Sequence, residues 1–146
     1  MEKKTNMIIQ KRSVDILMSK LIDSMPSFEG LLTYKGLGTL TRKNLIRVYS
    51  IVSPLMEEYN NVRISLAKEM SDGKRKIEVD PTQPEAGPIE RYDIKDQIKF
   101  NEELDKLRKI SENINIPVIT LKEFDSNPDV PTTLLARLSW MIIDDE

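Results

Sequence analysis

The stretch TRKNLIRVYSIVSPLMEEYNNVRISLAKEMSD, Thr41 to Asp72, decides the fold that we expect for this chain. Its apolar residues recur in alternating steps of three and four, the spacing of one stripe along an α-helix. A glycine follows at position 73, and glycine readily takes the left-handed conformation that closes a helix. We therefore predict one long helix over 41–72. Its apolar stripe comprises Leu45, Val48, Val52, Leu55, Tyr59, Val62 and Leu66.

Pro54 lies in the middle of this stretch. A proline inside a helix removes a backbone hydrogen bond and costs about 3 kcal/mol. Ser53 could cap a second helix that begins at Pro54, so two abutting helices are one alternative. Because the apolar spacing continues across the proline, we favour a single kinked helix.

Shorter elements are predicted on both sides of the long helix. The apolar spacing of Val14, Leu17, Leu21 and Met25 favours a helix over 13–25 that stops at Pro26. The glycine-containing residues 26–40 are expected to connect it to the long helix. Segment 76–94 is β-prone and rich in turn residues, which favours a small hairpin. Two further helices are predicted over 95–112 and 132–143, separated by an extended stretch over 116–121.

The expected fold is mainly α, a long helical hairpin with a short two- or three-stranded sheet as a small β appendage. A length of 146 residues suits a single domain over 1–146. With 39% hydrophobic and 32% charged residues, the composition is that of a globular chain rather than a disordered one.

The chain contains neither cysteine nor histidine. Thiol nucleophiles, zinc sites built on these residues and imidazole acid–base catalysis are therefore excluded. The apolar run Met7–Ile9 is too short for a signal peptide, and no stretch approaches the length of a membrane-spanning helix. We expect no enzymatic activity, no cofactor, no metal and no membrane partner. The expected location is the cytoplasm, or a virion if a phage encodes the chain.

Charged and glycine-rich segments are candidates for binding sites. The formal net charge of −2 gives no overall attraction for nucleic acid, so binding would need a local basic patch. The segment Lys35–Thr39 lacks the spacing of a phosphate-binding loop, and we interpret it as a turn. The carboxylates near Glu102 and at the chain end are interpreted as solvated surface. The candidate basic patch consists of Arg42, Lys43, Arg47, Lys74, Arg75 and Lys76.

Aromatic and methionine side chains provide a candidate protein interface. Tryptophan and tyrosine serve either as core residues or as anchors at interfaces. A helix of about thirty residues spans roughly 45 Å. The other helices of this chain are too short to cover that whole length. The candidate interface residues are Tyr49, Met56, Tyr59, Trp140 and Met141; for Trp140 the core interpretation is preferred.

From about residue 60 to 143, the chain resembles a group of small tailed-phage proteins of unknown function. These proteins have a long charged helix, a short extended stretch and a second charged helix. The resemblance implies a phage-encoded structural or accessory protein and carries no catalytic residue with it. It rests on segments 62–66 (VRISL), 92–96 (YDIKD), 99–104 (KFNEEL), 116–119 (IPVI) and 140–142 (WMI).

The function expected from the sequence is non-enzymatic protein–protein interaction or assembly. The partner is either another protein or a second copy of the chain, as a homo-oligomer or within a virion. The alternative is a small nucleic-acid-associated regulator that acts through the local basic patch. Its distinguishing property would be DNA binding that weakens steeply with salt.

Overall fold

The computed structural model describes residues 10–144 and contains helices and strands along its whole length. Because helix makes up 53% of it and strand 21%, the strands are more than an appendage. Six short strands form three two-stranded sheets within the described residues. The expected mainly α helical hairpin is therefore wrong. The apolar run Met7–Ile9 and the acidic residues Asp145 and Glu146 lie outside the described part of the chain.

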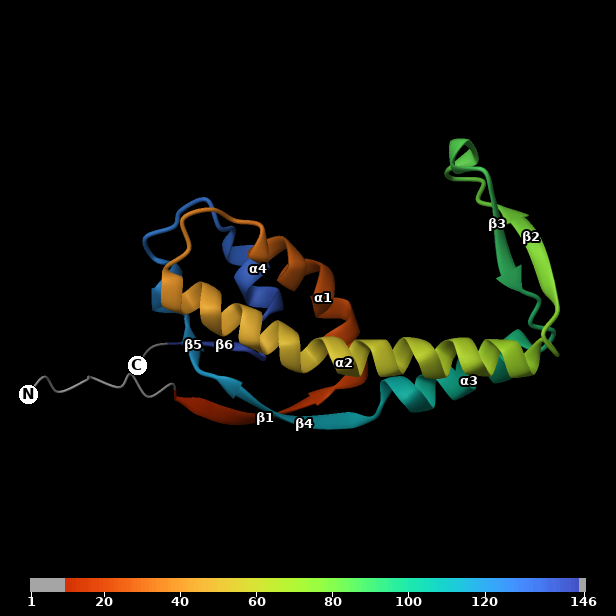
Figure 1. Ribbon diagram of the computed structural model, residues 1–146, viewed down its shortest axis with the longest axis horizontal. Coiled ribbons are helices and arrows are strands. Elements are labelled where there is room, and N and C mark those ends of the chain that lie inside the picture. The colour runs from red at the N-terminus through yellow and green to blue at the C-terminus, as the bar shows by residue number, and fades with distance from the viewer. Residues whose placement is uncertain (1–9, 145–146) are drawn as a thin grey trace, which may run out of the picture. The chain divides into compact units, whose positions relative to one another are not determined.

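Helices and strands are interspersed along the chain, and Figure 1 labels the α-helices and the strands. Strand β1 pairs antiparallel with β4, β2 pairs antiparallel with β3, and β5 pairs parallel with β6. Two short 3-10 helices lie at Pro84–Ala86 and Leu121–Phe124. The main elements are β1 (Lys11–Leu17), α1 (Met18–Leu32), α2 (Thr39–Met70), β2 (Arg75–Val79), β3 (Pro88–Tyr92), α3 (Gln97–Arg108), β4 (Ser111–Pro117), β5 (Ile119–Thr120), α4 (Thr132–Arg137) and β6 (Ile142–Ile143).

Backbone contacts divide the chain into two compact units. Unit 1 contains the described residues up to Pro54 and from Ile110 onward, and unit 2 contains Leu55–Lys109. The helix predicted over 41–72 corresponds to α2, which runs through Pro54 without a break and contributes residues to both units. The alternative of two abutting helices is therefore wrong. That residues 1–146 form one domain stays a prediction.

The helix expected over 13–25 is wrong in its first residues, because Lys11–Leu17 form strand β1. Along β1, Arg12, Val14 and Ile16 are the more buried positions, an alternation of period two that the helical spacing of later residues obscured. The partner strand β4 lies about a hundred residues away in sequence, with Leu17 opposite Ser111 in the register. Local spacing cannot reveal such a distant partner.

Helix α1 continues past the predicted stop at Pro26 and ends at Leu32. Proline costs one hydrogen bond there, but apolar residues on both sides of it are fully or almost fully buried. They are Leu21, Met25, Phe28 and Leu31, at helical spacing. Burial of this face offsets the loss at the proline. The connector predicted over 26–40 is therefore shorter than expected.

The predicted helices over 95–112 and 132–143 are both too long. Helix α3 begins after Asp96, whose side chain accepts a hydrogen bond from the Lys99 backbone N–H at 3.0 Å, and it ends at Arg108. Residues from Ser111 onward pair with β1 instead. Helix α4 ends at Arg137, and Ile142–Ile143 form β6. In both cases, residues whose local spacing favours a helix form a strand instead, because they pair with a strand elsewhere in the sequence.

Hydrogen bonds made by Trp140 join the two ends of the described chain within unit 1. The indole Nε1–H donates to Ser24 Oγ at 3.0 Å, and the Ser24 hydroxyl donates to the Leu21 carbonyl at 3.0 Å. The Arg12 guanidinium donates to the Trp140 carbonyl at 2.8 Å, and burial lowers the pKa of Arg12. Trp140 is therefore a core residue of unit 1, with only 6% of its surface exposed.

Among residues 10–144, no helix is both long enough and apolar enough to span a bilayer.

Replacing Ser24 by alanine tests the buried network. The Ser24→Ala change leaves the buried Trp140 N–H without its acceptor, so we expect a loss of about 1–3 kcal/mol in the free energy of unfolding. Urea denaturation monitored by tryptophan fluorescence measures it. Ser19→Ala, on the same helix, is the control and should change stability by less than about 0.5 kcal/mol. Equal effects of the two substitutions would contradict the role of Ser24.

Candidate protein-interaction surface

Unit 2 has a small core and a large apolar surface. Only Tyr59, Ala67 and Phe100 are buried hydrophobic residues within Leu55–Lys109. Unit 1, by contrast, buries a continuous set of isoleucine, leucine, methionine and aromatic side chains. A segment of this size with so few buried side chains gains little stability from its own packing. The exposed large hydrophobic residues of unit 2 are Val62, Ile64, Ile77, Val79, Ile89 and Ile98.

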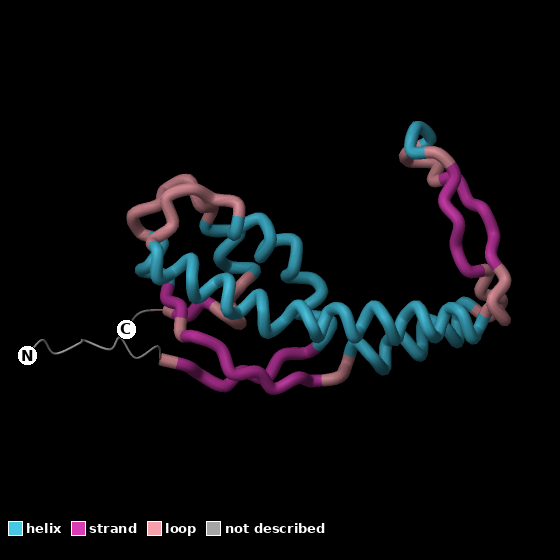
Figure 2. The backbone as a smooth tube through the Cα atoms, in the orientation of Figure 1, coloured by secondary structure: helices cyan, strands magenta, loops and turns pink. Residues whose placement is uncertain are grey.

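The strands β2 and β3 form a two-stranded ribbon, hereafter the ribbon, which begins where α2 ends (Figure 2). Asp72 and Gly73 have positive φ angles of 53° and 76°, and the Gly73 N–H donates to the Lys68 carbonyl at 2.9 Å, which closes the helix. At the ribbon's tip, Asp80 accepts hydrogen bonds from the Thr82 backbone N–H at 2.9 Å and from its hydroxyl at 2.6 Å. Gly87, with φ 79°, returns the chain into β3.

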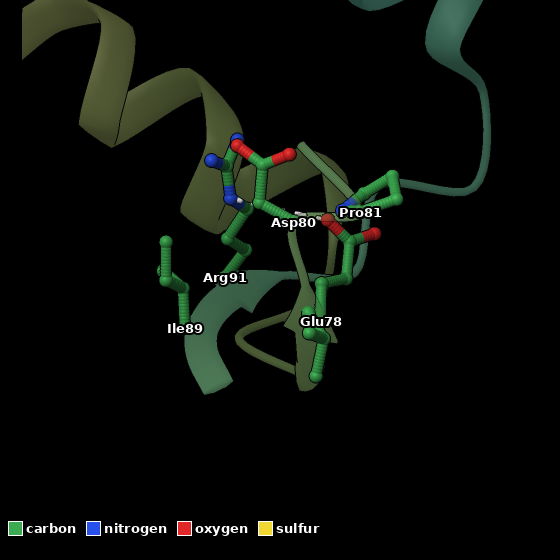
Figure 3. A pocket seen from close by; sticks show the side chains of 6 residues that line it. Glu78, Asp80, Pro81, Ile89 and Arg91 are labelled. Carbon is green, nitrogen blue, oxygen red and sulfur yellow. Dashed lines mark ion pairs between the residues drawn. The ribbon is translucent and has the colours of Figure 1, made fainter. Parts of the chain in front are cut away.

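One face of the ribbon is charged. The Lys76 ammonium lies 2.8 Å from a Glu78 carboxylate oxygen and 4.0 Å from Asp93. Figure 3 shows Arg91 beside Glu78, at 3.9 Å. The hydrogen bond from Lys76 lowers the pKa of Glu78 and raises that of Lys76. Next to this face, residues 78–81 with Ile89 and Arg91 line an open hollow of about 470 Å³.

The opposite face is apolar at its centre. Ile77 is 75% exposed and Val79 is 57% exposed. At one end of this face, the Arg75 guanidinium carbon lies 4.7 Å from the centre of the Tyr92 ring, and Arg75 donates to the Tyr92 hydroxyl at 3.1 Å. Arg75 also lies 3.9 Å from Glu90. The face therefore combines an apolar centre with a fixed cation and a fixed anion.

A wider groove within unit 2, of about 550 Å³, lies between the ribbon and two helices. Arg63 and Ala67 of α2 line it, together with Gln97 and Phe100 of α3. The ribbon contributes, among others, the half-buried Tyr92. This lining offers apolar contact and charged hydrogen-bonding groups, the combination found where side chains of a partner are held.

The five predicted interface residues are not free surface within this chain. Tyr59, Trp140 and Met141 are buried, and Tyr49 and Met56 are half-buried. The ring of Tyr49 packs against Phe28, with 5.7 Å between the ring centres. These side chains contribute to the packing of the chain itself.

The structure places the predicted basic patch in two different units. Arg42, Lys43 and Arg47 belong to unit 1. Lys74, Arg75 and Lys76 belong to unit 2, where Arg75 and Lys76 face the carboxylates described above. Those two charges are therefore partly neutralised. The glycine segment Lys35–Thr39 contains a turn at Gly36, with φ 81°.

Sequence reasoning did not identify the exposed apolar residues of the ribbon. Ile77 and Val79 alternate with charged residues in the segment RKIEV, which is the signal of a strand with one apolar face. This signal predicts the hairpin over 76–94. Because an isolated ribbon cannot bury such a face by itself, the same alternation also indicated an uncovered surface.

The ion pair on the charged face generates a pH prediction. Lys76 lowers the pKa of Glu78. The ion pair between Lys76 and Glu78 is therefore fully formed at pH values above the ordinary glutamate pKa, and it is lost as the pH falls through the lowered pKa of Glu78. In Lys76→Met, the pKa of Glu78 should return toward the ordinary glutamate value of about 4.3. NMR titration of the Glu78 carboxyl carbon measures it, with Lys109→Met as control. An unchanged Glu78 titration in Lys76→Met would contradict the pairing.

Comparisons with protein-family models, with curated proteins and with solved structures found no match to this chain. The role of unit 2 is therefore inferred from its own residues.

Proposed function

We propose that the chain is a non-enzymatic protein-interaction or assembly protein and that unit 2 is its docking surface. The observation that carries the proposal is the exposure of Ile77 and Val79 on a two-stranded ribbon. A ribbon of two strands is marginally stable in water, and its apolar face gains stability only when something covers it. A protein partner supplies that cover.

The free energy of burying the exposed side chains supports a protein partner. Full burial of an isoleucine or valine side chain is worth about 1.5–3 kcal/mol. Because Ile77 is 75% exposed and Val79 is 57% exposed, burying both would contribute about 2–4 kcal/mol toward the cost of ordering the two molecules. Adjacent charged groups such as Arg75 and Glu90, 3.9 Å apart, would add a polar rim with defined orientation.

The alternative, nucleic-acid binding through the basic patch, has weaker support. Phosphate binding depends on cations that are free to replace counterions. In unit 2, Lys76 already pairs with Glu78 at 2.8 Å, and Arg75 stacks on Tyr92. A role in a phage virion, or as a phage accessory factor, is the biological setting that the sequence resemblance implies for this proposal.

Photo-cross-linking tests the docking surface directly. A photoreactive amino acid is placed at Ile77 of the full chain, which is expressed in host cells. We expect one discrete cross-linked product, because the apolar face of the ribbon is covered by a defined protein. Irradiation followed by mass spectrometry identifies the product.

The matched control carries the same amino acid at Ile46, an isoleucine of unit 1 that is 53% exposed. A side chain that is exposed but has no partner should give only diffuse cross-linked products, and we expect this result at Ile46. Products of equal intensity and pattern at both positions, or none at Ile77, would contradict a docking surface on the ribbon.

The nucleic-acid alternative makes its own prediction. With a labelled DNA duplex, we expect no binding that depends on Lys74 and Lys76, as measured by fluorescence anisotropy. Binding that is tighter than about 1 µM at 50 mM salt, and that falls steeply by 200 mM in the wild type but is missing in K74A/K76A, would favour the regulator instead.

A further inference from the structure

We propose that the partner of the ribbon is a second copy of this chain, paired antiparallel along the free edge of β2 about a two-fold axis at Ile77. This inference rests on the proposed function and specifies its partner. The pairing would join two ribbons into one four-stranded sheet. Three observations carry it: the direction of the backbone groups of β2, its charge pattern and its exposed isoleucine.

The backbone of β2 has a free edge. In an antiparallel pair, residues alternate between those bonded to the partner strand and those whose N–H and C=O point away from it. The Asp93 N–H donates to the Lys74 carbonyl at 2.8 Å, so the carbonyl of position 74 points toward the strand that contains β3. By alternation, Lys76 and Glu78 bond to β3. The N–H and C=O groups of Arg75, Ile77 and Val79 then point outward.

Pro88 supports this assignment. It lies opposite Val79 in the register and has no N–H to donate. A non-bonded position is where a proline is tolerated in a ladder. The ribbon is a two-stranded sheet, so no strand of the described chain pairs with the outer edge of β2.

Only one two-fold register uses all five residues of β2. Centred on Ile77, it sets Ile77 opposite its own copy and Arg75 opposite Val79, so every outward backbone group finds a partner. The same register sets Lys76 of each copy opposite Glu78 of the other. Opposite charges in directly opposed positions stabilise a strand pair, whereas like charges destabilise it.

The neighbouring registers lack this complementarity. Centred on position 76 or 78, the pairing would oppose two copies of Lys76 or two copies of Glu78, and it would leave outward groups unpaired. The other edge of the ribbon is also less suitable. Pro88 offers no N–H there, and a two-fold register about Glu90 would oppose two glutamates. Charge pattern and backbone direction therefore select the β2 edge.

The exposed isoleucine gains a partner in this arrangement. Ile77, 75% exposed in the single chain, would lie beside the Ile77 of the second copy, with Val79 diagonal to it. The apolar centres of two ribbons thus become one continuous stripe, in which each Ile77 is shielded on the side that faces the other copy. A four-stranded sheet also has enough strands to be stable, whereas a two-stranded ribbon is only marginally stable.

Charge reversal on the full chain tests the inference by sedimentation velocity. Wild type should form dimers at micromolar to tens of micromolar concentration. K76E opposes two pairs of glutamates, and E78K opposes two pairs of lysines, so each variant should dimerise at least about tenfold more weakly. The double variant K76E/E78K restores opposite charges and should dimerise like wild type.

Mixing the two single variants gives the sharpest result. In a mixed dimer, both glutamates of K76E lie opposite both lysines of E78K, so the mixture should form heterodimers although each variant alone is monomeric. Ile77→Pro should also abolish dimers, because it removes an outward N–H that β3 does not use. Far-UV circular dichroism checks that each variant retains its secondary structure.

A wild type that stays monomeric up to about 100 µM would overturn the inference, as would dimers that ignore the charge reversals. Neither result would by itself remove the proposed function. Cross-linking from Ile77 to a different protein would then support a docking surface with another partner. The absence of any discrete product from Ile77 would contradict both.

Discussion

The structure depends on how the apolar stripe of helix α2 is covered along its length. In unit 1 the stripe residues Leu45, Val48 and Val52 are fully buried. Beyond Pro54, Tyr59 is buried, but Val62 is 37% exposed. One uninterrupted helix thus passes from a well-packed core into a unit with few buried side chains. The protein interaction that we propose follows from this difference in coverage.

Hydrogen bonding and charge explain why unit 2 keeps a defined structure despite its small core. The ribbon is held by its ladder, by the ion pairs of Lys76 and Glu78, and by the stacking of Arg75 on Tyr92. Exposed ion pairs of this kind contribute little to stability, because water screens them. They fix the register and the faces of the ribbon.

Sequence patterns were informative where structure is local. The stripe of α2 and the β-prone segment 76–94 both correspond to observed elements, because their spacing and turn residues act over a few positions. Strands β1 and β6 were missed because they depend on partners far away in sequence. Contacts between residues far apart in the sequence also decide which side chains are buried and which are exposed. Trp140 is held in the core by Ser24, a contact between residues 116 positions apart, whereas the exposure of Ile77 follows from the absence of a covering element.

Hydrogen exchange of individual β2 amides tests the central claim most directly. The amides of Lys76 and Glu78 face β3 and should be protected at every protein concentration. The amides of Arg75, Ile77 and Val79 face outward. Our account predicts that they exchange rapidly in dilute protein and become protected as concentration rises. Rapid exchange of these outward amides at every concentration, with the inner amides still protected, would contradict pairing of two copies through β2.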